Sequence, residues 1–208
     1  MRKLLLLTLV PLSLAAQDRF HVGLDLAHQG GASQTFVAED YAKIESKGRT
    51  QFGLTAGYRA MSIGRVQIRV TADLRLKADA DVDAGRLWFG TSRVGTLSHE
   101  SVALGGEASW CGPVEVGGGL QFRHERMTLT PDAKGTVATR ATTTRPWLTS
   151  HVGKTWKTAE GHRPFLRGTL SVSLDNSNED AKNLRAGEDL VKALAPGAEL
   201  GFQVGLRF

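Results

Sequence analysis

The chain contains few cysteines, which could form disulfides, and few prolines, which interrupt helices and strands. It has one cysteine, Cys111, so no intramolecular disulfide can form, and only 6 prolines among 208 residues. After the first sixteen residues, no apolar run approaches the roughly 18 residues that a membrane-spanning helix requires. These absences exclude a disulfide-stapled secreted scaffold and a helical membrane protein. The fold must therefore be held by backbone pairing and side-chain packing.

The first sixteen residues, MRKLLLLTLVPLSLAA, have the layout of a secretory signal peptide. Two basic residues come first, residues 4–10 are apolar, and small residues follow. We expect residues 1–16 to be removed, by cleavage after Ala15 or Ala16. Residues 17–208 then form one domain, since about 100–200 residues per domain is usual. Loss of the two basic residues lowers the formal charge of +5, which leaves too little positive charge to indicate nucleic-acid binding.

Apolar residues alternate with polar or small residues over most of the chain. A period of two predicts strands with unlike faces. Clear runs occupy residues 20–27, 51–59, 65–76, 101–110, 114–123, 166–175 and 198–208. A further strand is expected around residues 140–152, where a threonine-rich start and Pro146 blur the alternation. The pattern therefore predicts eight antiparallel strands.

The segments between these strands alternate in length. Long ones fall at about 29–49, 78–98, 127–139 and 176–197, and short ones at 60–64, 111–113 and 153–163. Outer-membrane barrels have short periplasmic turns and longer extracellular loops in this way. Leu184, Val191 and Leu194 recur at helical spacing before Pro196, which predicts a short amphipathic helix on the outer rim. A second helical stretch is expected at residues 36–46.

The alternation alone does not decide whether the apolar face meets lipid or fills a core, as it would in a secreted lipocalin-like barrel. The other face carries charges of both signs, which can pair inside a narrow barrel. We predict an interior charge network of Asp25, Arg59, Arg65, Arg69, Asp73, Arg75, Glu107, Glu115, Arg123, Arg167, Glu199 and Arg207. Aromatic residues fall at strand ends, as in the interfacial girdles of membrane barrels. The predicted girdle comprises Phe20, Tyr58, Trp110 and Phe208 on the periplasmic side, and Phe52 and Phe122 toward the opposite rim.

The last strand, GFQVGLRF, has an apolar residue at every second position: Phe202, Val204, Leu206 and Phe208. It resembles the C-terminal strand that the outer-membrane assembly machinery recognises. With this strand and eight strands in all, the chain resembles the small outer-membrane barrels of the outer membrane protein A and outer membrane protein X type. The resemblance implies an all-β, eight-stranded antiparallel up-and-down transmembrane β-barrel in the bacterial outer membrane of a Gram-negative-type cell. Its implied partners are outer-membrane lipid, lipopolysaccharide and the assembly machinery, and the barrel is expected to be a monomer.

Signals for catalysis or metal binding are weak. The six histidines lack metal-ligand spacing, and Asp79, Asp81 and Asp83 lack the glycine and glutamate of a calcium loop. The neighbours His124–Glu125 and Ser150–His151 point to opposite faces of their own strands, so neither pair forms a dyad within its strand. We predict no catalytic residue, no metal and no cofactor.

One barrel type hosts many activities, so the architecture says little about the role. We predict a non-enzymatic barrel with a structural or surface-interaction role, whose loops are presented outside the cell. The alternatives are a narrow channel for ions or small solutes and, less favoured, a lipid A-modifying enzyme. An eight-stranded barrel has an interior just wide enough for side chains to fill, which favours a closed interior over a channel.

Overall fold

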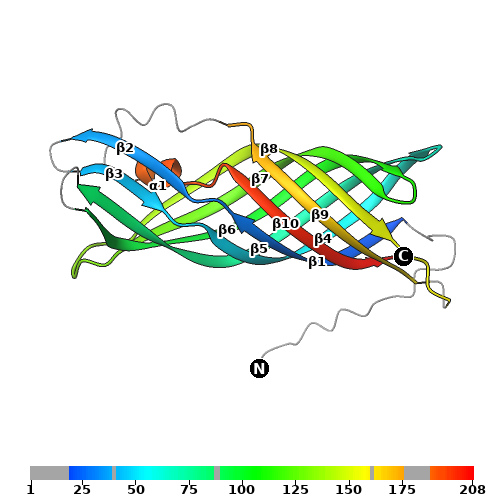
Figure 1. Ribbon diagram of the computed structural model, residues 1–208, viewed down its shortest axis with the longest axis horizontal. Coiled ribbons are helices and arrows are strands. Elements are labelled where there is room, and N and C mark those ends of the chain that lie inside the picture. Colours follow the sequence, from blue (N-terminus) through cyan, green and yellow to red (C-terminus); the bar gives the residue numbers. More distant parts are fainter. Residues whose placement is uncertain (1–18, 39–40, 87–89, 160–161, 176–187) are drawn as a thin grey trace, which may run out of the picture.

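The chain folds into one long antiparallel β-barrel (Figure 1). The structure, a computed structural model, describes residues 19–38, 41–86, 90–159, 162–175 and 188–208; the expected signal peptide lies outside them. Eight strands form the ring: β1 (Phe20–Gln29), β4 (Arg49–Ile63), β5 (Val66–Arg86), β6 (Gly90–Cys111), β7 (Glu115–Pro131), β8 (Thr139–Thr155), β9 (Arg163–Ser173) and β10 (Ala198–Arg207). Sequential ring strands pair with one another, and β10 pairs with β1, which closes the barrel. The predicted fold class is confirmed.

The period of two in the sequence becomes the two faces of the barrel wall. On β1, the side chain of Leu24 is 62% exposed, whereas Asp25 beside it points inward and is 2% exposed. The same alternation of buried and exposed residues runs along the other ring strands. Adjacent side chains of a strand point to opposite faces, so one regular pattern supplies both an apolar outer face and a polar interior.

The barrel has two unlike ends. Short turns and the C-terminus lie at one end, which we call the turn end (Figure 1). At the other, the mouth end, a hairpin of β2 (Ala32–Ala38) and β3 (Tyr41–Ser46) pairs with the outer part of β5. The predicted helix at residues 36–46 is therefore wrong. Pairing of β3 with residues 82–85 of β5 supplies the tertiary context that overrides local propensity.

The segment 78–98, predicted as a loop, is instead the paired outer part of β5 and β6, and only residues 87–89 lie outside the description. A register shift between Arg75 and Ala78 marks a β-bulge. Before it Arg75 points inward, and after it Ala80, Val82 and Ala84 do. An extra residue in one strand shifts the phase of the alternation, so the continuing strand does not match the pattern before it.

The strand expected around residues 140–152 is confirmed as β8, which carries Pro146. Pairing with β9 stops at the next residue, Trp147, which faces Ser173. Proline has no backbone N–H to donate, but the carbonyl of Pro146 still accepts from the backbone N–H of Leu174 at 2.9 Å, so the proline stands where pairing with β9 ends.

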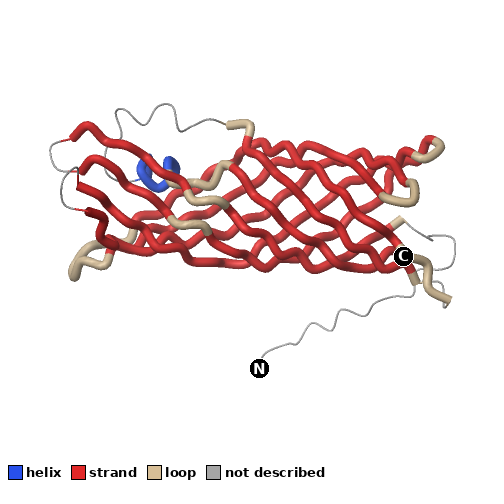
Figure 2. Tube along the Cα trace, viewed as in Figure 1, coloured by secondary structure: helices blue, strands red, loops and turns tan. Residues whose placement is uncertain are grey.

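A short helix, α1 (Glu188–Ala193), sits in the mouth of the barrel (Figure 2). Val191 and Leu194 are fully buried there against Val82, Leu97 and Met127, and Ala141 completes this apolar cluster. The expected helix is therefore present, but it fills the mouth rather than lying on the outer rim. Leu184, the first residue of the predicted helical pattern, lies outside the described residues. No helix in the described ranges is long and apolar enough to cross a membrane.

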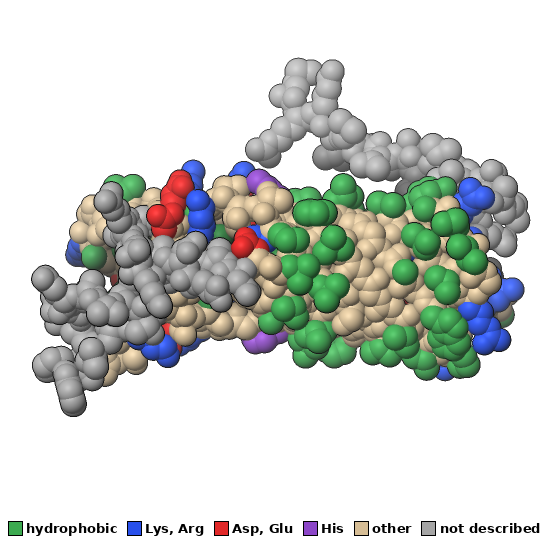
Figure 3. Space-filling view, turned by 90° about the horizontal axis from the view of Figure 1, so that it is seen from above, with side chains coloured by type: hydrophobic (Ala, Val, Ile, Leu, Met, Phe, Trp, Pro, Cys, Tyr) green, Lys and Arg blue, Asp and Glu red, His purple; other side chains and the backbone are tan. Residues whose placement is uncertain are grey.

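Apolar side chains cover the outer wall from the turn end to about the middle of the barrel (Figure 3). This belt ends toward the mouth at a row that includes Leu26, Phe52, Leu76, Val102 and Phe122, all exposed. Beyond it the outer wall carries charged and hydroxyl side chains. A band of exposed large apolar residues around a polar interior is the arrangement that suits a lipid environment.

Candidate functional site

Three clusters of charged side chains fill the barrel between the turn end and the mouth. At the mouth they are followed by an apolar plug, which consists of α1 and the segment directly after it, residues 194–196. The lower cluster is centred on Glu115, whose Oε1 accepts from Arg69 Nη1 at 2.8 Å and from Arg167 Nη2 at 2.6 Å. Its Oε2 accepts from Arg207 Nη2 at 2.6 Å. Glu107 Oε1 lies 3.2 Å from the Nη1 atoms of both Arg69 and Arg167. Two carboxylates thus share three guanidinium groups, which compensates the cost of burying them.

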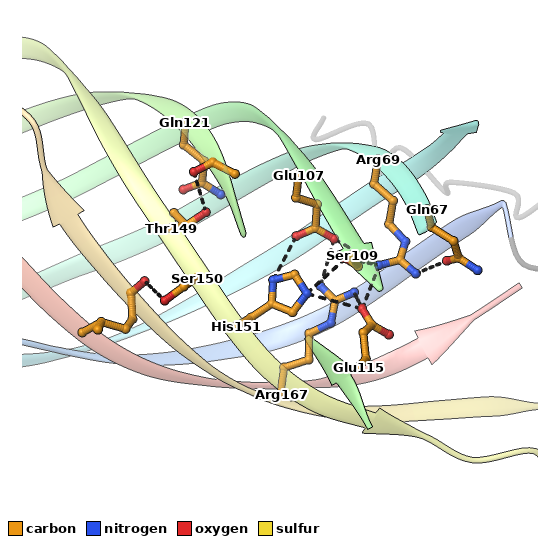
Figure 4. A network of polar contacts seen from close by, with 12 residues as sticks. Gln67, Arg69, Glu107, Ser109, Glu115, Gln121, Thr149, Ser150, His151 and Arg167 are labelled. Atoms are coloured by element: carbon orange, nitrogen blue, oxygen red, sulfur yellow. Dashed lines mark hydrogen bonds and ion pairs between the residues drawn. The ribbon is translucent and has the colours of Figure 1, made fainter. Parts of the chain in front are cut away.

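His151 lies between Glu107 and Glu115 in this cluster (Figure 4). Its Nε2 is 3.1 Å from Ser109 Oγ, and its Nδ1 is 3.6 Å from Glu107 Oε2. A serine, a histidine and an acid in this order are the groups of a nucleophilic triad. However, Ser109 is 1% exposed and also accepts from Arg69 Nη1 at 3.2 Å. A nucleophile needs room for its substrate, and this serine is enclosed by the ion pairs around it.

Glu107, Glu115 and His151 place one possible ligand atom each within 4.8 Å of one another, so they form a candidate metal site that spacing in the sequence does not indicate. The carboxylate oxygens already contact the guanidinium groups of Arg69 and Arg167. A cation placed there would be repelled by these groups, because like charges at such distances are unfavourable. These three side chains therefore suit a network of buried ion pairs better than a metal site.

The middle cluster joins strands from opposite sides of the ring. Glu199 on β10 accepts from Arg75 Nη1, and from Arg123 Nη1 at 2.8 Å. Arg75 Nη2 also lies 2.9 Å from Asp25 Oδ2. All four side chains are at most 5% exposed. They tie β1, β5, β7 and β10 together across the interior, and such a buried network is costly to break.

The upper cluster links the barrel wall to the plug. Arg145 Nε donates to Glu125 Oε2 at 2.6 Å, and its Nη2 donates to the carbonyl of Pro196 at 2.8 Å. His99 Nε2 lies 3.7 Å from Glu125 Oε1. Trp147 is fully buried with the Arg123 guanidinium 4.1 Å from its ring centre, a cation–π contact.

The plug itself is held by hydrogen bonds to its carbonyl groups. Gln34 Nε2 donates to the Ala193 carbonyl at 3.0 Å, and Ser46 Oγ donates to that of Leu194 at 3.4 Å. Together with Arg145, these groups satisfy carbonyls that a short helix leaves without intrahelical partners. The segment after α1 is therefore anchored on several sides of the mouth.

Small residues on the inner face make room for the lower cluster. A Cβ added at Gly117 would lie 2.6 Å from His151 Cε1, and one added at Gly153 would lie 2.6 Å from Arg167 Cγ. The imidazole and the guanidinium stem therefore lie directly over these glycines. The inward glycines are covered by neighbouring side chains here and do not widen a passage.

Of the residues predicted for the interior network, the structure brings most into the lower and middle clusters. Asp73 lies in the same region and accepts from Gln121 Nε2 at 2.6 Å, and Arg59 is half-buried on the inward face of β4. The prediction for Arg65 is wrong. It is exposed at the turn between β4 and β5, 5.9 Å from the ring centre of Trp110, because the chain reverses at Gly64 before the inward alternation resumes.

Sequence reasoning did not place Arg49, Arg145, His99 or His151 in the interior network. The side chains of all four are buried, at positions that continue the alternation of inward and outward residues on their strands. On β8 the signal was present, because Arg145, Trp147 and Thr149 alternate with outward residues, but Pro146 and the preceding threonines obscured it. Arg49 lies just before the run that was recognised, at residues 51–59.

The predicted girdle residues are all exposed. At the turn end, the ring centres of Phe20 and Tyr58 lie 5.0 Å apart. Phe208 pairs with Phe20 through two backbone hydrogen bonds. Phe52 and Phe122 lie at the mouth side of the belt. Phe202, Val204, Leu206 and Phe208 line the outer face of the last strand. Recognition of that strand by the assembly machinery stays a prediction.

No protein-family model matches the chain, and no curated protein matches it in sequence. Among solved structures, it resembles the outer membrane protein OprG from Pseudomonas aeruginosa, with 14% identity, 92% of this chain and 94% of that chain covered, and a TM-score of 0.52. The chain has the fold of a small outer-membrane β-barrel. This fold and the apolar belt agree with the predicted outer-membrane location.

Two further structures cover similar shares of the barrel. Neisserial surface protein A is 12% identical over 90% of this chain and 95% of that chain, with a TM-score of 0.43. The outer membrane protease OmpT from Escherichia coli is 9% identical over 92% and 97%, with a TM-score of 0.45. At these identities the likeness concerns the barrel architecture and not the activity.

Proposed function

We propose that the chain is a closed, non-enzymatic outer-membrane barrel that holds a β-structured platform outside the cell. The platform consists of β2, β3 and the parts of β5, β6 and β7 that lie beyond the apolar belt. The observation that carries the proposal is the filled interior: three charged clusters and an apolar plug follow one another along the barrel. Such a barrel acts as a rigid anchor rather than as a passage.

A cavity of about 30 Å³ lies between the lower and middle clusters, beside Gln121 and His151. One water needs about 10–15 Å³ of such volume, so the cavity has room for about two or three waters. Above it, Glu199, Trp147 and the plug residue Leu194 are each buried in the interior or the mouth. A narrow channel would need a continuous polar path, which these groups interrupt.

The platform extends well beyond the belt. Residues 78–86 of β5 pair with residues 90–99 of β6, and nine residues of strand at about 3.3 Å each give about 30 Å of length. Ion pairs cross its outer face: Arg93 Nε lies 3.3 Å from both Asp81 Oδ1 and Asp132 Oδ2, and Lys47 Nζ lies 3.2 Å from Asp83 Oδ2. Such a polar, paired surface suits contact with water and with other molecules outside the membrane.

Planar-bilayer recording tests whether the barrel is closed. We expect the purified full chain to produce no reproducible conductance steps, because side chains fill its interior. Heat-modifiable migration in gels, measured on the same sample, verifies that the protein is folded. Reproducible steps whose size changes in Arg69→Gln or Glu107→Gln would instead identify a channel through the lower cluster.

Site-specific labelling tests the orientation of the platform. In a Cys111→Ser background, Val137→Cys lies in the segment between β7 and β8, near the mouth, and Lys157→Cys lies between β8 and β9, at the turn end. A membrane-impermeant maleimide added to intact cells should label position 137 and leave position 157 unlabelled until the envelope is broken. The reverse pattern would place the platform in the periplasm and contradict the proposal.

A further inference from the structure

A groove on the outer wall crosses the boundary between the apolar belt and the polar surface above it. Its upper part has a volume of about 460 Å³ and its lower part about 250 Å³. The upper part is lined by Lys77, Ser98, His99, Glu100, Arg126, Thr128, Arg140 and Thr142. The lower part is lined by Leu74, Arg75, Glu100, Ser101, Val102, His124 and Arg126. Glu100 and Arg126 line both parts, so the two adjoin on the outer wall.

The β-bulge on β5 creates the upper edge of this groove. Arg75 faces Ser101 and Ala78 faces His99, so Leu76 and Lys77 together oppose the single residue Glu100. As a result Leu76 and Lys77 are both exposed on the outer wall, although they are adjacent in sequence. Bulges re-aim side chains in this way. Here the bulge sets a cation immediately above the last apolar residue of the belt on its strand.

Neighbouring strands add two more cations and several hydroxyl groups. Arg126 on β7 faces Glu100 on one side and Thr142 on the other, and Arg140 on β8 faces Thr128. Lys77, Arg126 and Arg140 therefore come from three strands and line one groove. Guanidinium and ammonium groups with nearby hydroxyl donors are the groups that bind phosphate.

The acids near these cations leave them available to a ligand. Arg126 Nη1 lies 2.9 Å from Glu100 Oε1, with Arg126 65% and Glu100 41% exposed. Lys77 Nζ lies 3.9 Å from Asp79 Oδ1. Exposed ion pairs of this kind contribute little to stability, so a phosphate competes with them at small cost. With Asp79 counted beside the lining residues, three cations face two carboxylates, so a positive formal balance remains.

We propose that this groove binds a phosphorylated, acylated glycolipid of the outer leaflet, with its phosphate on Lys77, Arg126 and Arg140 and an acyl chain against Leu74 and Val102. The phosphorylated lipid part of lipopolysaccharide has this chemistry. The lower part of the groove favours a lipid over free phosphate, because it continues into the belt. The inference rests on the proposed orientation, which places this rim in the outer leaflet.

Binding of purified full-length protein in neutral detergent tests the site. The probes are bis-phosphorylated lipid A, the same lipid without phosphates, and inorganic phosphate, measured by titration calorimetry. We expect the phosphorylated lipid to bind at least about tenfold more tightly than the dephosphorylated one, since charge-assisted hydrogen bonds contribute more than the 1.4 kcal/mol that corresponds to a factor of ten. The triple variant Lys77→Gln, Arg126→Gln, Arg140→Gln should lose this preference.

A charge-matched control is Lys134→Gln, Lys154→Gln, Lys157→Gln, which removes three exposed cations outside the groove and should bind as the unaltered protein does. The single variant Arg126→Gln should give an intermediate affinity, so the test stands even if the triple variant folds poorly.

Equal binding by the groove variants and the control would overturn the site. Equal binding of both lipids would show acyl contacts alone, and displacement of the lipid by equimolar inorganic phosphate would show a free-phosphate site; either result contradicts the proposal. Because binding is measured in detergent, its failure is distinct from a failure of the labelling experiment.

Discussion

Replacing Glu199 with glutamine is expected to lower the free energy of unfolding by about 3–5 kcal/mol, the usual cost of removing one partner from a buried ion pair. Glu199 accepts from Arg75 and Arg123, and all three side chains are buried in the middle cluster. Without the carboxylate charge, Arg75 keeps Asp25 as its partner. Arg123 loses the carboxylate to which both of its terminal nitrogens donate, and its guanidinium stays buried against the face of Trp147. Urea titration of the refolded protein in detergent, followed by the gel shift of the folded form, measures the change.

The matched control for this variant is Asp132→Asn, which removes a carboxylate from an exposed pair. Asp132 Oδ2 lies 3.3 Å from Arg93 Nε, and both side chains are about half exposed. Exposed pairs contribute about 0–1 kcal/mol, so the control should unfold at nearly the same urea concentration as the unaltered protein. Equal, small effects of both variants would mean that water reaches the middle cluster, which would weaken the case for a closed interior.

Replacing Leu24 with arginine is expected to cost about 2–4 kcal/mol in a lipid bilayer, the range found for a basic residue near the midplane on the lipid face of a barrel. Leu24 points outward from β1, between Phe20 at the turn end and Leu26 near the upper edge of the belt. It faces Leu54 on β4 and Val204 on β10, so its surroundings are apolar on both sides. Reversible unfolding in liposomes measures the effect.

Val137→Arg is the control for this substitution. Val137 is 83% exposed and lies between β7 and β8, beyond the belt, so the same charge should change stability by no more than about 0.5 kcal/mol. In a secreted barrel that turned its apolar face to a core, position 24 would be buried and intolerant in water. In the barrel found here, the penalty should appear in bilayers and shrink in the absence of lipid acyl chains. A penalty of the same size in both settings would argue against a lipid-facing belt.

Much of the wall could be predicted because each strand carries its own alternation. Leu24 and Asp25 show their opposite faces in the sequence, and so do Leu200 and Glu199. The regular signal was lost where local geometry departs from a period of two. The bulge at residues 76–77 changed the phase on β5, so the outer half of this hairpin was predicted as a loop. Arg65 has an odd number, as the inward residues that follow it on β5 do, but it belongs to the turn and its side chain is exposed.

The candidate sites depended on features that alternation does not carry. Lys77, Arg126 and Arg140 were not singled out, because each is an ordinary polar residue of its own strand. They form one groove only because β5, β7 and β8 are held in a particular register. Likewise Ser109 and His151 are 42 residues apart, and their contact follows from pairing through β7.

The sequence by itself determined that this protein is an eight-stranded barrel with one apolar and one charged face, because the direction of each side chain follows from the local geometry of its strand. Charges of both signs on the second face, which can pair inside a narrow barrel, indicated that this face is the interior. Only the tertiary structure decided which charges meet, that α1 closes the mouth, and where the outer groove lies. Arg75 and Glu199 are 124 residues apart, and their contact depends on the tilt and stagger of the whole ring. Those quantities belong to the closed sheet and to no single strand.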